Sequence, residues 1–319
     1  MPADIHYYRP MIVLDDKQLT ELRCELDDAD EPERVRALLI EAFGMSRYLE
    51  KRRILEVGDL PIHCELYESR PEDPVVLFVP GIGTYSEMYC EFLHELSRER
   101  LNVVGVDVRG HGRSGGPRGL YRVEEVARDL SEVITRLEQD FVGPFAVFGS
   151  SIGSVLGLAC AEKDERVRAL LCHTLFITEC PPDLLHLIGW NWVAWSRTLV
   201  PHVKLNLRSF LDISRLLQGN HLGQFARYDD LIVWDYPVET LASLYTRRTR
   251  AYTEELGFRG GVIIGDSDEI IDLSYERFVV RRMRHPFDLI LIPGGRHMLP
   301  FDRPDAMIRA AGRWLRSAA

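Results

Sequence analysis

Short apolar runs alternate with helical stretches from Val75 to the end of the chain, and this alternation constrains the fold more than any other feature. Runs that are apolar on both faces are typical of strands in a parallel sheet covered by helices on both sides. Two earlier runs are separated by Gly58-Asp59-Leu60-Pro61 and predict an antiparallel hairpin at one edge. We therefore expect an α/β fold with a doubly wound, mostly parallel eight-stranded sheet. The expected strands are Arg53–Val57, Ile62–Tyr67, Val75–Val79, Val103–Val106, Phe145–Phe148, Ala169–Cys172, Val262–Ile264 and Leu289–Ile292.

The alternation breaks between Leu175 and Ala251, where no strand of this buried kind is predicted. Two helical stretches occur instead, over residues 184–195 and 205–217, and the first contains three of the five tryptophans. We interpret this interval as a helical cap inserted between the sixth and seventh strands. The expected parts are an N-terminal extension (1–45) with an amphipathic helix over about Glu31 to Phe43, a core in two segments (46–174 and 252–319), and the helical cap (175–251).

The composition excludes several classes of function. The 319 residues carry a formal net charge of −10, whereas a general nucleic-acid binder needs a surplus of lysine and arginine. No apolar run reaches the length of a membrane span, and the first residues lack the apolar core of a signal peptide. Six cysteines without C-x-x-C spacing indicate neither a zinc site nor a disulfide framework. We expect a cytoplasmic protein without metal or organic cofactor, and the sequence is compatible with a homo-oligomer.

A candidate nucleophile lies at the centre of the sequence Gly149-Ser150-Ser151-Ile152-Gly153. An apolar strand precedes it and a helical stretch of small residues follows, so Ser151 is at the apex of a sharp turn between strand and helix. Such a turn strains the central residue and requires glycine at the flanking positions. It also exposes the serine hydroxyl beside the N–H groups that begin the helix. This pattern is a nucleophile elbow.

A second stretch has the same spacing but lacks this context. Ser114 is at the centre of Gly112-Arg113-Ser114-Gly115-Gly116, but Pro117 and Gly119 follow where a helix should begin. The overlapping residues 110–115 also spell G-x-G-x-x-G. A dinucleotide site would need a helix to open at once, whereas the next predicted helix begins only at Val123. We therefore assign neither a nucleophile nor a cofactor site to this loop.

A serine hydroxyl needs a base within hydrogen-bond reach, and functional residues of a doubly wound sheet gather beyond the carboxyl ends of its strands. His297 follows the last strand and is the preferred base. His173, at the end of the sixth strand, is the nearest competitor. His111 is in a glycine-rich loop where turn structure explains it, and His285 precedes a strand and should lie at the opposite edge.

The acid that orients the base should follow the penultimate strand, where Asp266-Ser267-Asp268-Glu269 provides three carboxylates. Asp268 is preferred because it lies farther beyond the strand end and can reach towards His297. Asp266 is the alternative, with the simpler role of ending the strand in a turn. The order Ser151, Asp268, His297 is the one expected for a nucleophile elbow on this fold.

These pieces resemble the α/β-hydrolase superfamily and, within it, the monoacylglycerol lipase and lysophospholipase group, which is similar to the S33 serine aminopeptidases. The matching segments cover the chain from about residue 50 to its end: 107–119, 149–153, 265–268 and 295–297. The resemblance implies that the backbone N–H groups of Ile152 and Ile82 form the oxyanion hole. It gives the glycine-rich loop over 107–119 a structural role only.

The chain departs from that group at two positions. Pro80 stands where relatives usually carry histidine before the glycine of the oxyanion loop. Ser150 stands where they often carry histidine before the nucleophile. Neither change removes a member of the triad or a donor of the oxyanion hole. Both weaken the transfer of a substrate preference from relatives.

The sequence thus predicts a serine hydrolase that cleaves a carboxylic ester through an acyl-enzyme on Ser151. The apolar cap and the resemblance suggest a small-molecule or lipid-like substrate with a hydrophobic acyl group, such as a monoacylglycerol or lysophospholipid. The same triad supports the alternatives of a thioesterase, an amidase, a C–C hydrolase or an acyltransferase. A non-catalytic binding protein of this fold is a further alternative, which has no physical need for all three of Ser151, Asp268 and His297.

Overall fold

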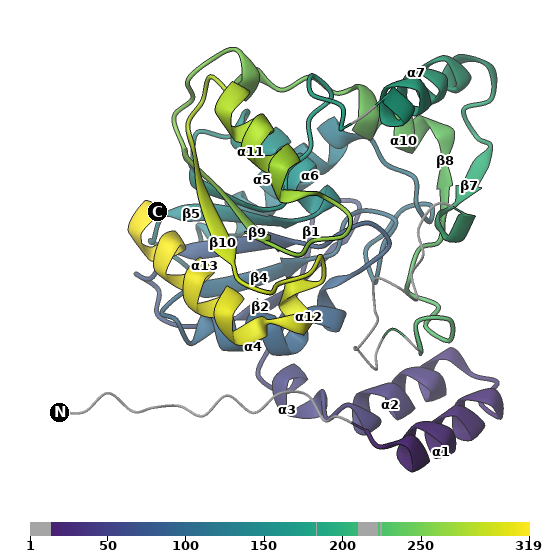
Figure 1. Ribbon diagram of the computed structural model, residues 1–319. Helices are drawn as coiled ribbons and strands as arrows, with labels where there is room; N and C mark the ends of the chain where they lie inside the picture. The colour runs from purple at the N-terminus through teal and green to yellow at the C-terminus, as the bar shows by residue number, and fades with distance from the viewer. Residues whose placement is uncertain (1–13, 183, 210–222, 224) are drawn as a thin grey trace.

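The computed structural model describes residues 14–182, 184–209, 223 and 225–319, and it is built on one eight-stranded sheet (Figure 1). The strand order is β1-β2-β4-β3-β5-β6-β9-β10. β2 runs antiparallel to both of its neighbours and the other pairs are parallel, so the predicted mostly parallel sheet with an antiparallel hairpin at one edge is confirmed. The strands are β1 (Arg53–Val57), β2 (Ile62–Tyr67), β3 (Val75–Val79), β4 (Asn102–Val106), β5 (Phe145–Ser150), β6 (Val167–His173), β9 (Arg259–Gly265) and β10 (Phe287–Ile292).

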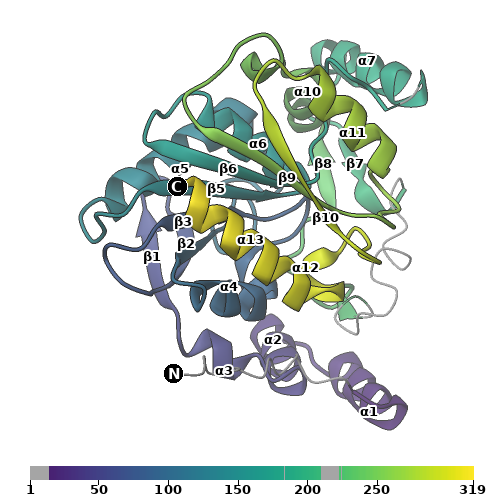
Figure 2. The same ribbon diagram turned by 60° about the vertical axis from the view of Figure 1, so that its left-hand side comes forward.

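Helices cover both faces of this sheet, as Figures 1 and 2 show. One face carries α5 (Val123–Leu137), α6 (Ile152–Ala161) and α11 (Leu273–Arg282). The opposite face carries α4 (Cys90–Ser97) and α13 (Pro304–Ala318), with the short α12 (Leu299–Asp302) before α13. Two apolar cores result, one on each side, and every residue of β3 and β4 is buried between them.

The helix predicted from Val123 to Leu137 has those same bounds in the structure. Its apolar residues lie on one face of the helix and are all buried: Val123, Val126, Leu130, Val133, Ile134 and Leu137. A 3₁₀ helix, η1 (Ser86–Tyr89), leads into α4.

Three helices precede the sheet. The expected amphipathic helix is α2 (Pro32–Ala42), and α3 (Ser46–Leu49) follows it. A further helix, α1 (Asp16–Asp27), was not predicted. Asp15 caps it by accepting a hydrogen bond from the N–H of Gln18, whose side chain accepts one from the N–H of Asp15. Residues 1–13 of the predicted extension lie outside the described residues.

The interval between β6 and β9 contains α7 (Leu184–Leu199), α10 (Val238–Thr246) and the 3₁₀ helices η2 (Leu207–Ser209) and η3 (Arg250–Tyr252). It also contains β7 (Lys204–Asn206) and β8 (Asp235–Pro237), which form a separate antiparallel pair. The helix predicted over 205–217 is therefore wrong at Leu205 and Asn206, because three residues are too few to show strand periodicity. Residues 210–217 of that prediction lie outside the described residues.

The three tryptophans of α7 have different surroundings. Trp190 is buried and stacks on Tyr245 of α10, with ring centroids 5.6 Å apart. Trp192 and Trp195 are 54% and 77% exposed. The aromatic stretch therefore packs against the rest of the molecule on one side and faces solvent on the other. No helix in the described part of the chain combines the length and the hydropathy needed to cross a bilayer.

Candidate active site

Ser151 lies at a strained turn between β5 and α6. Its φ of 53° and ψ of −119° form a backbone conformation that residues other than glycine rarely adopt. The flanking glycines are required by space, because a Cβ on Gly149 would lie 2.4 Å from the Gly153 carbonyl oxygen. A Cβ on Gly153 would lie 2.1 Å from the Val79 carbonyl oxygen of β3. The sequence thus folds into an elbow that presents the serine at the carboxyl end of the sheet.

His297 joins Ser151 to Asp268. Its Nε2 lies 3.3 Å from the Ser151 Oγ, and its Nδ1 lies 2.9 Å and 3.1 Å from the two carboxylate oxygens of Asp268. The imidazole and the carboxylate are both buried. Burial raises the pKa of Asp268, but hydrogen bonds from His297 and from the N–H groups of Ile271 and Ile270 outweigh that effect and hold it below its ordinary value. The carboxylate therefore stays charged beside the imidazole.

The two loops that carry Asp268 and His297 pack directly on each other. A Cβ on Gly265 would lie 2.1 Å from the Gly295 carbonyl oxygen, so this approach is open only to glycine. Asp266 does not reach His297: its Oδ1 accepts a hydrogen bond of 2.8 Å from the N–H of Gly294. Its carboxylate therefore ties the two loops together at the strand ends.

Glu269 is a neighbouring residue to which the sequence analysis gave no role. Its carboxylate accepts a hydrogen bond of 3.1 Å from the backbone N–H of His297 and one of 2.8 Å from the Arg296 guanidinium. The cluster of three carboxylates in four residues was the only sequence signal. The structure gives each a different role: Asp266 binds the Gly294 amide, Asp268 binds the His297 ring, and Glu269 binds the His297 backbone.

His173, the nearest competitor for the base, is fully enclosed beside His297. The two rings lie 5.6 Å apart at 31°, and Nδ1 of His173 lies 3.1 Å from the Ser150 Oγ. Burial, and then the nearby His297, lower the pKa of His173 to about 3, so this ring stays neutral. Its Nε2 has no hydrogen-bond partner among the described residues. Ser150, which departs from the family pattern, thus contacts the ring that packs beside His297.

The remaining sequence candidates have structural partners. Ser114 of the second G-x-S-x-G stretch is buried, and its hydroxyl donates to the Asp107 carbonyl oxygen and accepts from the N–H of His63. His285 lies at the amino end of β10 against Phe258, where its Nδ1 accepts from the N–H of Leu256. Neither residue contacts Ser151.

The loop after β3 runs beside the serine. A Cβ on Gly81 would lie 3.6 Å from the Cβ of Ser151. The next amide, that of Ile82, has no acceptor within the described ranges. Ile152 is the first residue of α6, so its N–H has no intrahelical acceptor either. These amides, which the resemblance names as oxyanion donors, thus have no acceptor in the part of the chain that the structure describes.

This loop has a partner that sequence reasoning missed. The N–H of Gly83 donates to the hydroxyl of Tyr236, which lies in the interval between β6 and β9. That hydroxyl also contacts His111 of the glycine-rich loop. No spacing rule connects positions 153 residues apart, so the sequence carried no signal for this contact.

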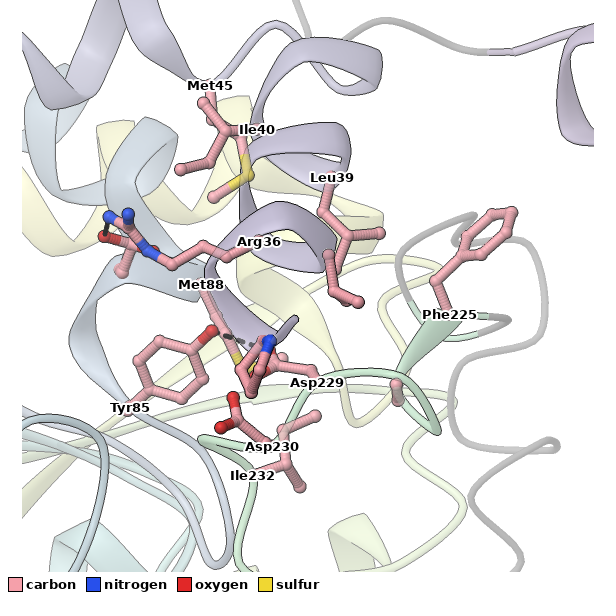
Figure 3. A pocket seen from close by; sticks show the side chains of 14 residues that line it. Arg36, Leu39, Ile40, Met45, Tyr85, Met88, Phe225, Asp229, Asp230 and Ile232 are labelled. Atoms are coloured by element: carbon pink, nitrogen blue, oxygen red, sulfur yellow. Dashed lines mark hydrogen bonds and ion pairs between the residues drawn. The ribbon is translucent and has the colours of Figure 1, made fainter. Parts of the chain in front are cut away.

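A pocket lies between α2, η1 and residues 225–232 (Figure 3). Most of its lining is apolar, and its charged members are Arg36, Glu87, Asp229 and Asp230. Arg36 binds Glu87, and the carboxylate of Asp229 accepts a hydrogen bond of 2.6 Å from the Tyr85 hydroxyl. The labelled apolar lining residues are Leu39, Ile40, Met45, Met88, Phe225 and Ile232.

The sequence profile of the family described as "Serine aminopeptidase, S33" matches residues 70–304. This match covers most of the chain and includes the elbow and the loops that carry Asp268 and His297. Together with the sheet order, it shows that the chain belongs to this family of α/β hydrolases.

The chain is also similar to individual proteins. The chain is 30% identical over 158 residues to the uncharacterized hydrolase YraK of Bacillus subtilis, a match that spans 49% of this chain and 53% of that protein. The chain therefore spans about half the length of this curated relative. The monoacylglycerol lipase of Paleococcus ferrophilus has a similar fold, with a TM-score of 0.64 at 20% identity over 80% of this chain and 100% of that one. A soluble variant of monoglyceride lipase from Saccharomyces cerevisiae gives a TM-score of 0.67 at 15% identity over 82% and 94%.

Proposed function

We propose that the protein is a serine hydrolase that cleaves a carboxylic ester with a hydrophobic acyl group. The observation that carries this proposal is the contact of His297 with both Ser151 and Asp268, at 3.3 Å and 2.9 Å. Nucleophile, base and orienting acid within hydrogen-bond reach are the arrangement that acyl transfer requires.

The reaction proceeds in two halves. Nε2 of His297 accepts the Ser151 proton as Oγ attacks the ester carbonyl carbon, and Asp268 stabilises the imidazolium. The N–H groups of Ile82 and Ile152 bind the oxyanion of the tetrahedral intermediate. His297 then donates the proton to the leaving alkoxide, which departs as the alcohol and leaves an acyl-enzyme. Water attacks the acyl-enzyme by the same steps in reverse order, and this attack releases the carboxylic acid and restores Ser151.

The hydrophobic acyl group is proposed from the residues that lie near the loop after β3. Ile82 packs against the apolar core, and a Cβ on Gly83 would contact Leu207 of η2 at 3.6 Å. The interval 175–251, proposed as a cap, is rich in apolar side chains. The lipases named above act on monoacylglycerols, and a substrate of that class is our proposal for this chain.

Labelling with a fluorophosphonate probe tests the nucleophile. We expect the native protein to be labelled at Ser151, and the Ser151→Ala variant and a denatured sample to remain unlabelled. Ser114→Ala is the matched control from the second G-x-S-x-G stretch and should label normally. A folded native protein that resists the probe would refute the proposal.

A series of p-nitrophenyl esters tests the acyl group. We expect kcat/KM to rise from acetate to medium or long acyl chains, because each buried methylene adds about 0.8 kcal/mol of transfer free energy. An optimum at acetate would contradict the hydrophobic acyl pocket, and thioesters or amides cleaved faster than matched esters would favour one of the alternative reactions.

A further inference from the structure

Gly83 of the loop after β3 is held from both sides by the interval between β6 and β9. Its N–H donates a hydrogen bond of 2.7 Å to the Tyr236 hydroxyl, and its carbonyl oxygen accepts one of 2.9 Å from the N–H of Val233. Gly83 has a φ of +78°, and a Cβ there would lie 2.7 Å from the Val233 carbonyl oxygen. The two segments therefore pack backbone against backbone at this residue.

The Tyr236 hydroxyl can donate one hydrogen bond, and its neighbours determine which group accepts it. The hydroxyl itself accepts from the N–H of Gly83. Nδ1 of His111 lies 3.2 Å from the Arg109 carbonyl oxygen, which can only accept, so the neutral ring carries its proton on Nδ1 and its Nε2 accepts from the Tyr236 hydroxyl. Both rings are buried, and burial lowers the pKa of His111 to about 4, so the imidazole is neutral and its Nε2 can accept. Each of the two hydrogen bonds that link Gly83, Tyr236 and His111 thus has one donor and one acceptor.

Residues 225–236, which end at Tyr236, are also held at their N-terminal end. Phe225 packs on Phe43, with ring centroids 5.8 Å apart, and the Tyr228 hydroxyl donates to Asp27 of α1. Asp229 accepts from the Tyr85 hydroxyl, next to η1, as the dashed line in Figure 3 shows. Residues 225–236 therefore connect the N-terminal helices to the loop after β3.

We propose that Tyr236 is a positioning residue that fixes the oxyanion loop by holding the Ile82–Gly83 peptide through its hydrogen bond to Gly83. This inference rests on the proposed function, because it assumes that the N–H of Ile82 binds the oxyanion. The N–H of Ile82 belongs to the preceding peptide group, between Gly81 and Ile82. Hydrogen bonds to the N–H and carbonyl oxygen of Gly83 fix the chain directly after Ile82, and this limits how far the Ile82 N–H can turn. An oxyanion donor stabilises the transition state only if it is held in place before the reaction.

The test is the variant Tyr236→Phe, which keeps the ring and removes the hydroxyl. We expect kcat for a p-nitrophenyl ester to fall by about 10- to 100-fold, somewhat less than the loss of a whole oxyanion donor. KM should change by less than about twofold, since the ground-state ester does not depend on this donor. Binding of a phenylboronic acid, whose adduct with Ser151 places an oxygen in the oxyanion hole, should weaken by a similar factor to kcat.

Tyr275→Phe is the matched control. Tyr275 is also buried, accepts from a backbone N–H (Ile177, 3.4 Å) and donates to a carbonyl oxygen (Cys180, 2.8 Å), but it does not contact the oxyanion loop. We expect a similar change in melting temperature for both variants and an unchanged kcat for Tyr275→Phe. A kcat that falls equally in both variants would show that the loss of a buried hydroxyl, rather than the position of the loop, causes the effect, and would overturn the inference.

Substitution of His111, which accepts from the Tyr236 hydroxyl, gives a second test of the positioning role, and this test holds even if Tyr236→Phe does not fold. His111→Leu leaves the Tyr236 hydroxyl without its acceptor and should lower kcat, whereas His111→Gln supplies a carbonyl oxygen and should restore part of it. Wild-type kcat in folded Tyr236→Phe or in His111→Leu would refute the positioning role. A wild-type protein that neither hydrolyses esters nor reacts with a fluorophosphonate would refute the proposed function instead, so the two failures are distinguishable.

Discussion

Asp268 and Asp266 are two residues apart in one turn, yet their carboxylates have different surroundings. Asp268 is buried and receives hydrogen bonds from His297, Ile270 and Ile271. Asp266 is more exposed and receives one from the N–H of Gly294. The first contact fixes the tautomer of the proposed base, whereas the second only joins two loops.

This difference predicts unequal effects of two matched substitutions. Asp268→Asn places an amide where Nδ1–H of His297 needs an acceptor and favours the wrong tautomer, so kcat should fall by about 10³- to 10⁴-fold. Asp266→Asn keeps a carbonyl oxygen for Gly294 and should stay within about threefold of wild type. Steady-state hydrolysis of one p-nitrophenyl ester measures both. A larger loss in Asp266→Asn would assign the acid role to that residue.

At the scale of elements, α6 follows the strained Ser151 and packs closely against the end of β3. Gly153, in its first turn, has no room for a side chain, because the carbonyl oxygens of Val79, the last residue of β3, and of Pro80 lie 2.1 Å and 2.6 Å from where its Cβ would be. Gly189 in α7 is the opposite case, with no atom within 4 Å of a Cβ built there. Glycine is therefore required by space in α6 but not in α7.

The same substitution should therefore have opposite effects in these helices. Gly153→Ala must displace backbone atoms of β3, so we expect it to lower the free energy of unfolding by about 3 kcal/mol or more and to abolish esterase activity. Gly189→Ala should raise that free energy by up to about 1 kcal/mol, because alanine is the better helix former. Urea denaturation followed by far-UV circular dichroism measures both. Equal stabilities would show that α6 can move away from β3 at little cost.

The sheet, helix α5 and the family could be predicted because periodicity and turn motifs are local in sequence. The hydrophobic pattern of α5 repeats over four turns, and the elbow spans only residues 149–153. The strands β7 and β8 were missed because a three-residue strand shows no period. The contact of Gly83 with Tyr236 was missed because it depends on how a long insertion folds back, which no local pattern encodes.

For the whole molecule, one buried acid links the interval between β6 and β9 to α11. Glu276 of α11 accepts a hydrogen bond from the N–H of Leu175, shortly after β6, and its Oε2 has no partner among the described residues. Burial, with a smaller effect of Asp268, raises its pKa from 4.5 to about 8. The folded chain therefore keeps this proton at neutral pH, where the unfolded chain has lost it.

Stability should consequently depend on pH through this residue. Because the folded pKa lies above the unfolded value, the free energy of unfolding falls as pH rises from about 4.5 to 8. Glu276→Gln keeps an oxygen for Leu175 but has no proton to lose. We expect its melting temperature to match wild type near pH 4.5 and to exceed it by several degrees above pH 8. Differential scanning calorimetry from pH 4.5 to 9 measures this, and parallel curves would exclude ionisation of Glu276 as the cause.

The uneven surroundings of the α7 tryptophans have a spectroscopic consequence. Indole emission shifts to longer wavelength in water, so Trp192 and Trp195 should emit to the red of Trp190, which lies against Tyr245. With three of the five tryptophans on this single helix, much of the intrinsic fluorescence reports on α7 rather than on the sheet. Collisional quenching by iodide would act mainly on the two exposed indoles. The chain thus carries its own optical probe for any ligand or surface that covers α7.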